Sequence, residues 1–334
     1  MQNDIVKVDS ASHPSAPAQG MDIAANGHII HVLTQGRGPA VLFCHGFPDT
    51  AETWRCQMQA VAAAGYCAVA LDLRGFGKSY APADIDLYTS LHVVGDFVAV
   101  LDALGMETAV LVGHDWGADY AQRAAVMRPD RFRAIVSLSI PFAPRGEISL
   151  WDQLRQRGLE RRYYSISMVE PDAGARFEPA ATSIPAILYW LSASPPSGQR
   201  WDPVNPELHM LRPAPATVPD WVDQTYLQRT IRAFEHSGFD TGLNYYRVVQ
   251  KSFDLTATFK NALIHQPSLY IWGAADGLCR FFHPDGPTLE ESRKVQPGLM
   301  DIIRLDNAGH WIQHEAADRL NAELIKFLKA IESK

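Results

Sequence analysis

Short apolar runs alternate with helical patterns in the first and last parts of the chain, and this rhythm most restricts the possible folds. Strands that alternate with helices predict crossover connections and a mostly parallel sheet. The runs are continuously apolar, as expected for strands buried on both faces. We therefore expect an α/β fold. The predicted strands lie in 28–36, 40–44, 66–71, 109–113, 134–138, 268–276 and 300–310, and the predicted helices are 96–104, 119–126 and 320–331.

The middle of the chain has a different texture, because it is rich in Trp, Tyr and Pro from about 142 to 263. Helical stretches occur there without clear strands, and proline-rich connections occupy 192–207 and 212–220. We interpret this segment as a largely helical insertion that lies over the core as a lid. The expected organisation is a flexible tail over 1–21, a core made of 22–141 and 264–334, and a lid over 142–263.

Composition excludes several classes of protein. The net charge is -7 and no cluster of Lys and Arg stands out, which argues against a nucleic-acid partner. The first 20 residues lack the basic and apolar parts of a secretory signal, and no apolar run could span a bilayer. The four cysteines form no CxxC pair. We expect a cytoplasmic protein, either a monomer or a homodimer, with no membrane association.

Polar residues follow four of the predicted strands, at the sheet edge where α/β proteins build their sites. They are the segment 45–48 (HGFP), Asp115, Asp276 and His310. In VLVGHDWGADY (110–120) an acidic residue stands between two glycines where many hydrolases have Gly-x-Ser-x-Gly on a strand-to-helix turn. The order along the chain is that of a nucleophile, an acid and a histidine, with Asp115 in the place of the serine.

An ordered set of motifs carries a resemblance to a known family. From about residue 22 onward the chain resembles α/β-hydrolases of the epoxide hydrolase family, which implies the α/β-hydrolase fold with an inserted helical lid. The resemblance implies Asp115 as nucleophile, His310 as the base that activates water, Asp276 as its partner, and no cofactor. The matching motifs are HGFPDTAETW, DLRGFGKS, GHDWGADYAQRAA, RPDRFRAIVSLSIPF, GLNYYR and NAGHW.

The chemistry of a carboxylate nucleophile supports the same activity. An aspartate with an ordinary pKa of about 3.9 is already ionised and needs no base to attack. Attack on an acyl carbon would give an anhydride, whereas attack on a saturated carbon gives an ester, so we expect an epoxide or a halide as substrate. His310 would then deprotonate water for ester hydrolysis. We expect the backbone N–H groups of Phe47 and Trp116 to stabilise the oxyanion.

The leaving group separates the two candidate substrates. An alkoxide needs a proton donor, and the resemblance implies two lid tyrosines in that role. The second matches Tyr246 in GLNYYR. The first matches Tyr164, seven residues before Pro171, although Met168-Val169 replace the Phe-Gln of the family pattern, and the adjacent Tyr163 is an alternative.

Features of related dehalogenases are missing. Haloalkane dehalogenases often carry Asn where this chain has Pro48, and fluoroacetate dehalogenases carry Arg where it has Trp116. Some relatives place the acid after the strand at 134–138, where this chain offers only Ser139. We therefore expect an epoxide hydrolase acting on a small-molecule epoxide and water. Haloalkane dehalogenase is the alternative within the same chemistry, and a non-catalytic ligand-binding protein is the alternative of another class.

Structural roles compete with each catalytic assignment. Asp115 could be a helix N-cap, and Asp276 a turn residue, with Asp285 and Asp306 as alternative acids. The lid tyrosines could serve only in packing. His310 and His314 have the spacing of a zinc helix, but no Glu follows His310 and no third ligand is evident, so we expect no metal. The expected lining of the substrate pocket is His45, Pro48, Trp116 and Trp311.

Overall fold

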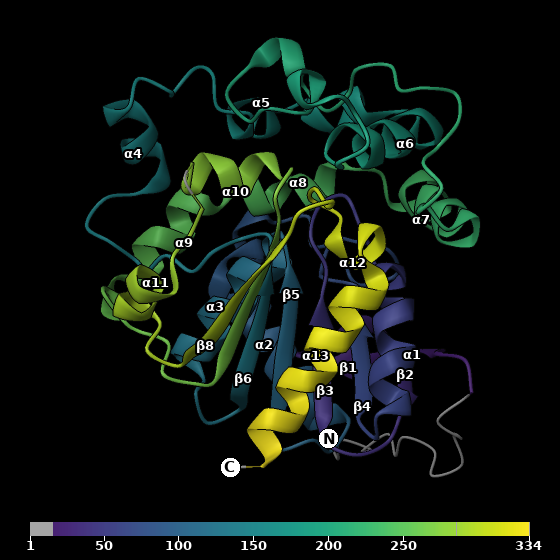
Figure 1. Cartoon of the computed structure of the whole chain (residues 1–334), viewed down its shortest axis with the longest axis vertical. Helices are drawn as coiled ribbons and strands as arrows, with labels where there is room; N and C mark the ends of the chain where they lie inside the picture. The colour runs from purple at the N-terminus through teal and green to yellow at the C-terminus, as the bar shows by residue number, and fades with distance from the viewer. Residues whose placement is uncertain (1–15, 285, 334) are drawn as a thin grey trace.

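A computed structural model describes residues 16–284 and 286–333, and its centre is an eight-stranded sheet (Figure 1). The strand order is β1-β2-β4-β3-β5-β6-β7-β8. Strand β2 runs antiparallel to β1 and β4, and every other pair is parallel, which confirms the expected mostly parallel sheet. The strands are β1 Gln19–Ala25, β2 His28–Gly36, β3 Ala40–Cys44, β4 Cys67–Leu71, β5 Ala109–His114, β6 Phe132–Leu138, β7 Ser268–Gly273 and β8 Leu299–Leu305.

The first strand begins inside the segment that the sequence predicts as a tail. Strands β1 and β2 form a hairpin through Asn26 and Gly27, which both have positive φ. An Asn-Gly pair is the preferred two-residue hairpin turn, because both positions require positive φ. Residues 19–21 therefore belong to the sheet, and residues 1–15 of the predicted tail lie outside the described residues.

Helices cover both faces of the sheet. Strands β3, β4 and β5 are buried along their whole length, as their continuous apolar runs predict. Helices α1 and α13 pack on one face and share an apolar cluster with it, whereas α2 and α3 cover the other face. The core helices are α1 Arg55–Ala63, α2 Ser90–Ala103, α3 Trp116–Met127, α10 Gly277–Phe282, α11 Leu289–Val295, α12 Ile312–Glu315 and α13 Ala317–Glu332, with 3-10 turns η1 Ala51–Trp54 and η2 Ile85–Tyr88.

Between β6 and β7 the described chain contains helices and no strand. Figure 1 shows α4 to α7 arranged across the carboxyl ends of the parallel strands, with α8 beneath them. We call residues 142–263 the lid. Its helices are α4 Leu150–Gln156, α5 Ser165–Met168, α6 Ala180–Trp190, α7 Gln224–Ser237, α8 Asp240–Arg247 and α9 Val249–Leu255, with 3-10 turns η3 Ala173–Phe177, η4 Ser197–Gln199, η5 Pro206–Leu208 and η6 Ala257–Phe259.

Aromatic rings join the lid to the core. The ring of Phe47, which follows β3, lies 5.2 Å from Phe177 and 5.8 Å from Tyr246, and both partners belong to the lid. Edge-to-face pairs of this kind stabilise packing beyond the apolar area that they bury. One continuous apolar cluster therefore runs from the α2–α3 face of the sheet into the lid.

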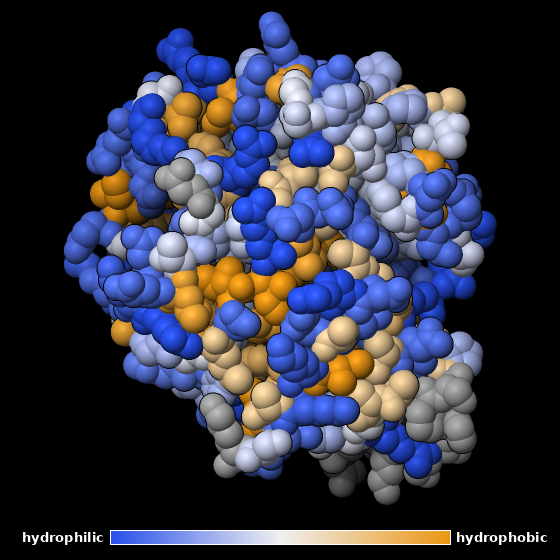
Figure 2. Space-filling model, in the orientation of Figure 1, coloured by the Kyte–Doolittle hydropathy of each residue, from blue (hydrophilic) through white to orange (hydrophobic). Residues whose placement is uncertain are grey.

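In the view of Figure 2 most of the surface is hydrophilic, and hydrophobic residues gather below the lid, where β8 lies in Figure 1. Among the described residues, no helix is both long and apolar enough to cross a bilayer.

Candidate active site

The nucleophile predicted from the sequence stands on a strained turn between β5 and α3. Asp115 has φ 53° and ψ -123°, which is rare for a residue with a side chain. The turn leaves almost no space around it. A Cβ atom on Gly46 would lie 2.3 Å from Asp115 Oδ1, and one on Gly117 would lie 2.0 Å from the backbone oxygen of Cys44. The glycines therefore allow the backbone to approach closely enough for the turn to form.

The carboxylate of Asp115 is held by backbone N–H groups. The N–H of Phe47 donates to Oδ1 over 3.0 Å, and the N–H of Trp116 also acts on the carboxylate, where it opposes the rise in pKa that burial causes. Asp115 is only 6% exposed, so these donors act in a site with little water. Both donors that the sequence predicts for the oxyanion thus lie at the carboxylate. The same two groups could stabilise negative charge developing on one of its oxygens.

His310 stands between two carboxylates. Its Nδ1 lies 3.1 Å from Asp276 Oδ2, and its Nε2 lies 3.8 Å from Asp115 Oδ2. A proton on Nδ1 facing Asp276 leaves the lone pair of Nε2 directed at the nucleophile, where a general base would need it. The structure therefore brings together the three residues that the sequence singles out after β5, β7 and β8.

Asp276 is fixed on both of its oxygens. As the N-cap of α10 it accepts the N–H of Leu278 on Oδ1 over 2.8 Å. Ser139 donates its hydroxyl to Oδ2, and the same Oγ lies 3.1 Å from His310 Nδ1. The other predicted acids are not in this position. Asp306 is exposed and pairs with Arg304 over 2.9 Å, and Asp285 lies outside the described residues.

Ser139 is a site residue to which sequence reasoning assigns no role. It follows β6 with φ 70° and is fully buried beside Asp276 and His310. The sequence identifies it only as a position without a carboxylate. Its place directly after a parallel strand is the signal that could have included it, because all such positions meet at one edge of the sheet.

Burial and charge shift the ionisation of the site in opposite ways. Burial favours the neutral form of His310, but the Asp276 carboxylate outweighs it and raises the pKa of the imidazole above its usual value. Burial also raises the pKa of Asp115, although His310 and the N–H groups of Phe47 and Trp116 oppose that change. A more basic imidazole suits a residue that must take a proton from water.

Tyr164 and Tyr246 converge in the lid above the nucleophile. Their ring centroids are 6.0 Å apart, and the ring of Tyr246 stands edge-on to Trp116 at 4.9 Å. Tyr163 packs instead on Phe281 of α10, with ring centroids 5.0 Å apart. Burial, and then the charge of Asp115, raise the pKa of Tyr246 well above its usual value, so the hydroxyl keeps its proton and can donate it in a hydrogen bond.

The remaining residues predicted for the pocket have backbone or packing partners. His45 is fully buried, its Nδ1 lies 2.8 Å from the carbonyl oxygen of Gly46, and its Nε2 accepts the N–H of Leu73 over 3.0 Å. Burial lowers the pKa of His45 to about 4, so it stays neutral. Both nitrogens serve to hold the HGFP turn in place.

The other two residues predicted for the pocket, Trp311 and Pro48, are buried. Trp311 is 1% exposed, and its ring packs 4.9 Å from that of His310. Pro48 is buried behind Phe47. Contact of either residue, or of His45, with substrate stays a prediction. His314, the second member of the zinc-like pair, bonds through Nε2 to Thr53 Oγ1 over 2.8 Å.

Comparison with known proteins places the whole chain among close relatives. Residues 39–169 match the model of the α/β hydrolase fold family. An epoxide hydrolase of Caballeronia sordidicola is 48% identical over 325 residues, covering 97% of this chain and 98% of that protein. Epoxide hydrolase A of Mycobacterium tuberculosis is 35% identical, covering 95% and 99%.

Solved structures agree with this relationship. An epoxide hydrolase from an endophytic Streptomyces superposes with a TM-score of 0.88 at 35% identity, covering 95% of this chain and 97% of that one. An epoxide hydrolase of Vigna radiata superposes with a TM-score of 0.82 at 31% identity, covering 94% and 98%. With its sheet, its strand-end residues and these relatives, the chain belongs to the epoxide hydrolase family of α/β-hydrolase fold proteins.

Proposed function

We propose that this protein hydrolyses an epoxide to a vicinal diol through an ester formed on Asp115. One observation carries the proposal: a carboxylate occupies the strained turn after β5, with Oδ1 bound by the Phe47 N–H at 3.0 Å and Oδ2 3.8 Å from His310 Nε2. A carboxylate in this place favours displacement at a saturated carbon over acyl transfer. The names of the relatives, all epoxide hydrolases, support the same substrate class.

Ring opening is the first half of the proposed reaction. One oxygen of Asp115 attacks an epoxide carbon, the carbon–oxygen bond of the ring breaks, and an ester and an alkoxide result. Tyr164 and Tyr246 would donate hydrogen bonds to the ring oxygen and supply the proton that the alkoxide takes. Their raised pKa values and their position over Trp116 support this role, because both hydroxyls stay protonated at neutral pH.

Ester hydrolysis is the second half. His310 would take a proton from water through Nε2, and the resulting hydroxide would attack the carbonyl carbon of the Asp115 ester. The negative charge would develop on the oxygen bound by Phe47 and Trp116. Collapse would break the bond between the ester carbonyl carbon and the alkyl oxygen, and the leaving alkoxide would take the imidazolium proton to complete the diol. The proton left on the Asp115 carboxyl group would return to the tyrosine that donated one in the first half, which restores the carboxylate. The imidazolium would be stabilised by Asp276, which itself is held by Ser139.

One observation favours a second candidate function. Trp116 Nε1 is buried and has no hydrogen-bond partner among the described residues. A departing halide needs N–H donors rather than a proton, so this group would suit a haloalkane substrate attacked by the same Asp115. Comparing diol release from styrene oxide with bromide release from a dibromoalkane separates the two activities.

We also propose that the protein acts in a reducing cytoplasm, because all four cysteines are free. We propose that it does so as a monomer or a homodimer.

A trapping experiment tests the covalent mechanism. The variant His310→Gln lacks the base, so incubation with styrene oxide should accumulate an adduct on Asp115 that peptide mass spectrometry detects. In the wild type, a single turnover in isotopically labelled water should give a diol without label, because its new oxygen comes from Asp115. An adduct on another residue, or label in the diol of the first turnover, would rule the mechanism out.

A further inference from the structure

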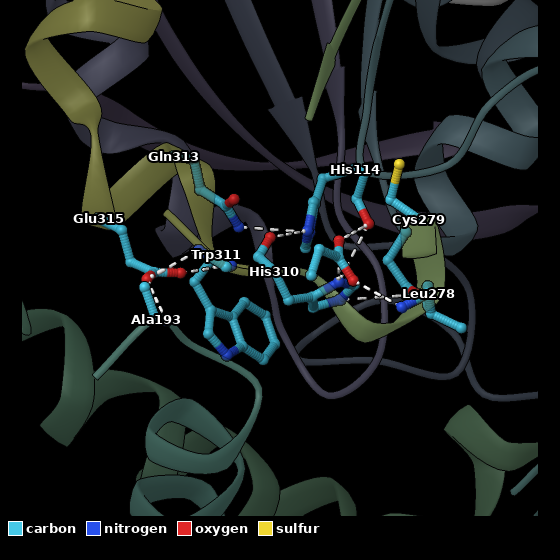
Figure 3. A network of polar contacts seen from close by, with 12 residues as sticks. His114, Ala193, Leu278, Cys279, His310, Trp311, Gln313 and Glu315 are labelled. Carbon is cyan, nitrogen blue, oxygen red and sulfur yellow. Dashed lines mark hydrogen bonds and ion pairs between the residues drawn. The ribbon is translucent and has the colours of Figure 1, made fainter. Parts of the chain in front are cut away.

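In the loop that carries His310, the backbone N–H groups of Gly309, His310 and Trp311 all have hydrogen-bond partners. Gly309 N–H donates to Glu315 Oε2 over 3.0 Å, and Trp311 N–H donates to Glu315 Oε1 over 3.0 Å. The N–H of His310 itself donates to the backbone oxygen of Leu191 over 2.9 Å. A single carboxylate thus holds the two residues on either side of the histidine (Figure 3).

The other side of this contact belongs to the lid. Glu315 Oε2 also accepts the N–H of Ala193 over 2.7 Å, two residues beyond Leu191 and just after α6. We call residues 191–193 the lid strip. Figure 3 shows the carboxylate of Glu315 lying between Ala193 and Trp311, and Trp311 Nε1 donates to the backbone oxygen of Ile187 in α6 over 3.4 Å.

No space separates the loop from the lid strip. A Cβ atom placed on Gly309 would lie 2.5 Å from the carbonyl carbon of Ser192 and 2.6 Å from the oxygen of Leu191. Two backbones that approach so closely cannot move independently, because buried backbone groups that lose their partners are destabilising. Any shift of the lid strip would therefore move the loop, and any shift of the loop would move the lid strip.

The hydrogen bonds of the Glu315 carboxylate all come from backbone N–H groups in the part of the chain that the structure describes. Among residues 16–284 and 286–333 it forms no ion pair with a basic side chain. Its three partners are N–H donors, which favour the ionised carboxylate, but burial outweighs them and raises the pKa of Glu315 to about 7. None of its hydrogen-bond partners belongs to Asp115 or to the lid tyrosines. Its effect on catalysis therefore passes through His310, through the position of the loop and through a charge that helps the Asp276 carboxylate to raise the pKa of the imidazole.

We propose that Glu315 is a positioning residue that binds the His310 loop to the lid strip. His310 is then correctly placed to activate water only while this end of the lid is closed over the core. The proposal rests on the proposed role of His310. Ring opening uses Asp115 and the lid tyrosines and does not need the imidazole as a base. Release of this contact should therefore slow ester hydrolysis far more than ester formation.

Rapid-quench measurements of the two steps with styrene oxide test this proposal in Glu315→Ala and Glu315→Gln. With Glu315→Ala we expect hydrolysis of the Asp115 ester to slow by about 100-fold, the effect of a misplacement of about 1 Å in a catalytic group. Ester formation should change by less than about 3-fold, so the adduct should accumulate. Glu315→Gln should lie between the wild type and Glu315→Ala, because its amide oxygen can still hold Gly309 and Ala193 while its NH₂ faces the Trp311 N–H.

Two further variants keep the test decisive. Glu323→Ala removes a carboxylate of α13 that only pairs with exposed Arg319 and Lys326, and it should leave both steps unchanged. Gly309→Ala keeps the Glu315 side chain but forces the loop and the lid strip apart. It should reproduce the selective loss of ester hydrolysis. Equal slowing of both steps in Glu315→Gln, or no slowing of either, would overturn the proposal. Lack of any adduct in His310→Gln would instead contradict the proposed function.

Discussion

The core and the lid hold their candidate catalytic groups in different ways. In the core, Asp115 is fixed by backbone N–H groups and by glycines that leave no room for a methyl group, and His310 is fixed by Asp276. In the lid, Tyr164 and Tyr246 are held by aromatic rings that pack edge-on at about 5 to 6 Å. In the proposed mechanism, ester chemistry thus depends on tight backbone geometry, whereas leaving-group stabilisation depends on side chains held by aromatic packing.

Adding one methyl group beside Asp115 in the core should reduce activity more than any other change considered. In Gly46→Ala the new Cβ would lie 2.3 Å from Asp115 Oδ1, so the turn that carries the Phe47 N–H must move. We expect ester formation to slow by about 100-fold, because the nucleophile is misplaced. Ester hydrolysis should slow by at least about 1,000-fold, because the same shift also removes an oxyanion donor. Single-turnover kinetics with styrene oxide measure both rates.

Gly146→Ala is the matched control for that prediction. A Cβ atom on Gly146 meets no atom within 4 Å, and its φ is not in the left-handed region. It should leave both rates unchanged. If Gly46→Ala retains nearly full activity while its thermal unfolding matches that of the wild type, the close fit of the turn is not what positions Asp115.

Much of the core could be predicted from the sequence because parallel strands produce a strong and local signal. The strands predicted at 28–36, 40–44, 109–113 and 134–138 agree with β2, β3, β5 and β6 to within two residues at each end. The hairpin of β1 was missed, although Asn26-Gly27 is the strongest short-range hairpin signal, because the polar run before it suggested a tail.

The candidate site could be predicted only where its residues follow predicted strands or match family motifs. Asp115, His310 and Asp276 each stand at a strand end, so the fold brings them together. Ser139 and Glu315 act through contacts between segments far apart in the sequence, Ser139 with Asp276 and Glu315 with Ala193. The place of Ser139 directly after a strand could have included it, whereas no local pattern marks Glu315, because its partner Ala193 is defined only by the packing of the lid on the core.

The lid tyrosines offer the next largest effect. Tyr246→Phe should slow ring opening by about 100-fold, and Tyr164→Phe by about the same or less, since general acid catalysis contributes roughly 100-fold or more. The rate of ester hydrolysis should stay unchanged in both variants, because that step uses core residues. The alkylation and hydrolysis rates are separated by rapid-quench kinetics.

Tyr163→Phe serves as the control for the tyrosine pair. Its ring packs on Phe281 and not on Tyr246, so we expect a change of less than about 3-fold in either step. A large loss of ring opening in Tyr163→Phe with little loss in Tyr164→Phe would exchange the roles of the two neighbours. Equal losses of both steps in Tyr246→Phe would instead mean that the lid residue supports the fold of the site.

Ser139→Ala should have a smaller effect, confined to the core. The variant removes the hydroxyl that Ser139 donates to Asp276 Oδ2, leaving Asp276 with the Leu278 N–H and His310. With one donor fewer, Asp276 should orient His310 less well, and we expect ester hydrolysis to slow by about 10-fold, one hydrogen bond to a charged group. Ester formation should not change, and a loss in that step alone would contradict the assignment.

The last prediction concerns stability rather than activity, at a direct contact between the core and the lid. Asp49 of the core accepts the hydroxyl of Tyr226 from lid helix α7 over 3.1 Å and the N–H of Thr50 over 2.8 Å, both on Oδ1. It is fully buried, and burial raises its pKa to about 7. An unfolded chain would release this proton near pH 4, so the folded state binds more protons between these values.

The free energy of unfolding of the wild type should therefore fall as the pH rises from about 4 to about 7, and Asp49→Asn should lack this part of the fall. Stability from the retained proton is fully present below the unfolded pKa and is lost as the pH passes the folded one. We expect the variant to gain on the order of 1–3 kcal/mol on the wild type between pH 5 and pH 8. Urea unfolding at both pH values measures the difference, with exposed Asp306→Asn as the control. Parallel pH profiles for wild type and Asp49→Asn would mean that this carboxyl ionises without disturbing the contact between lid and core.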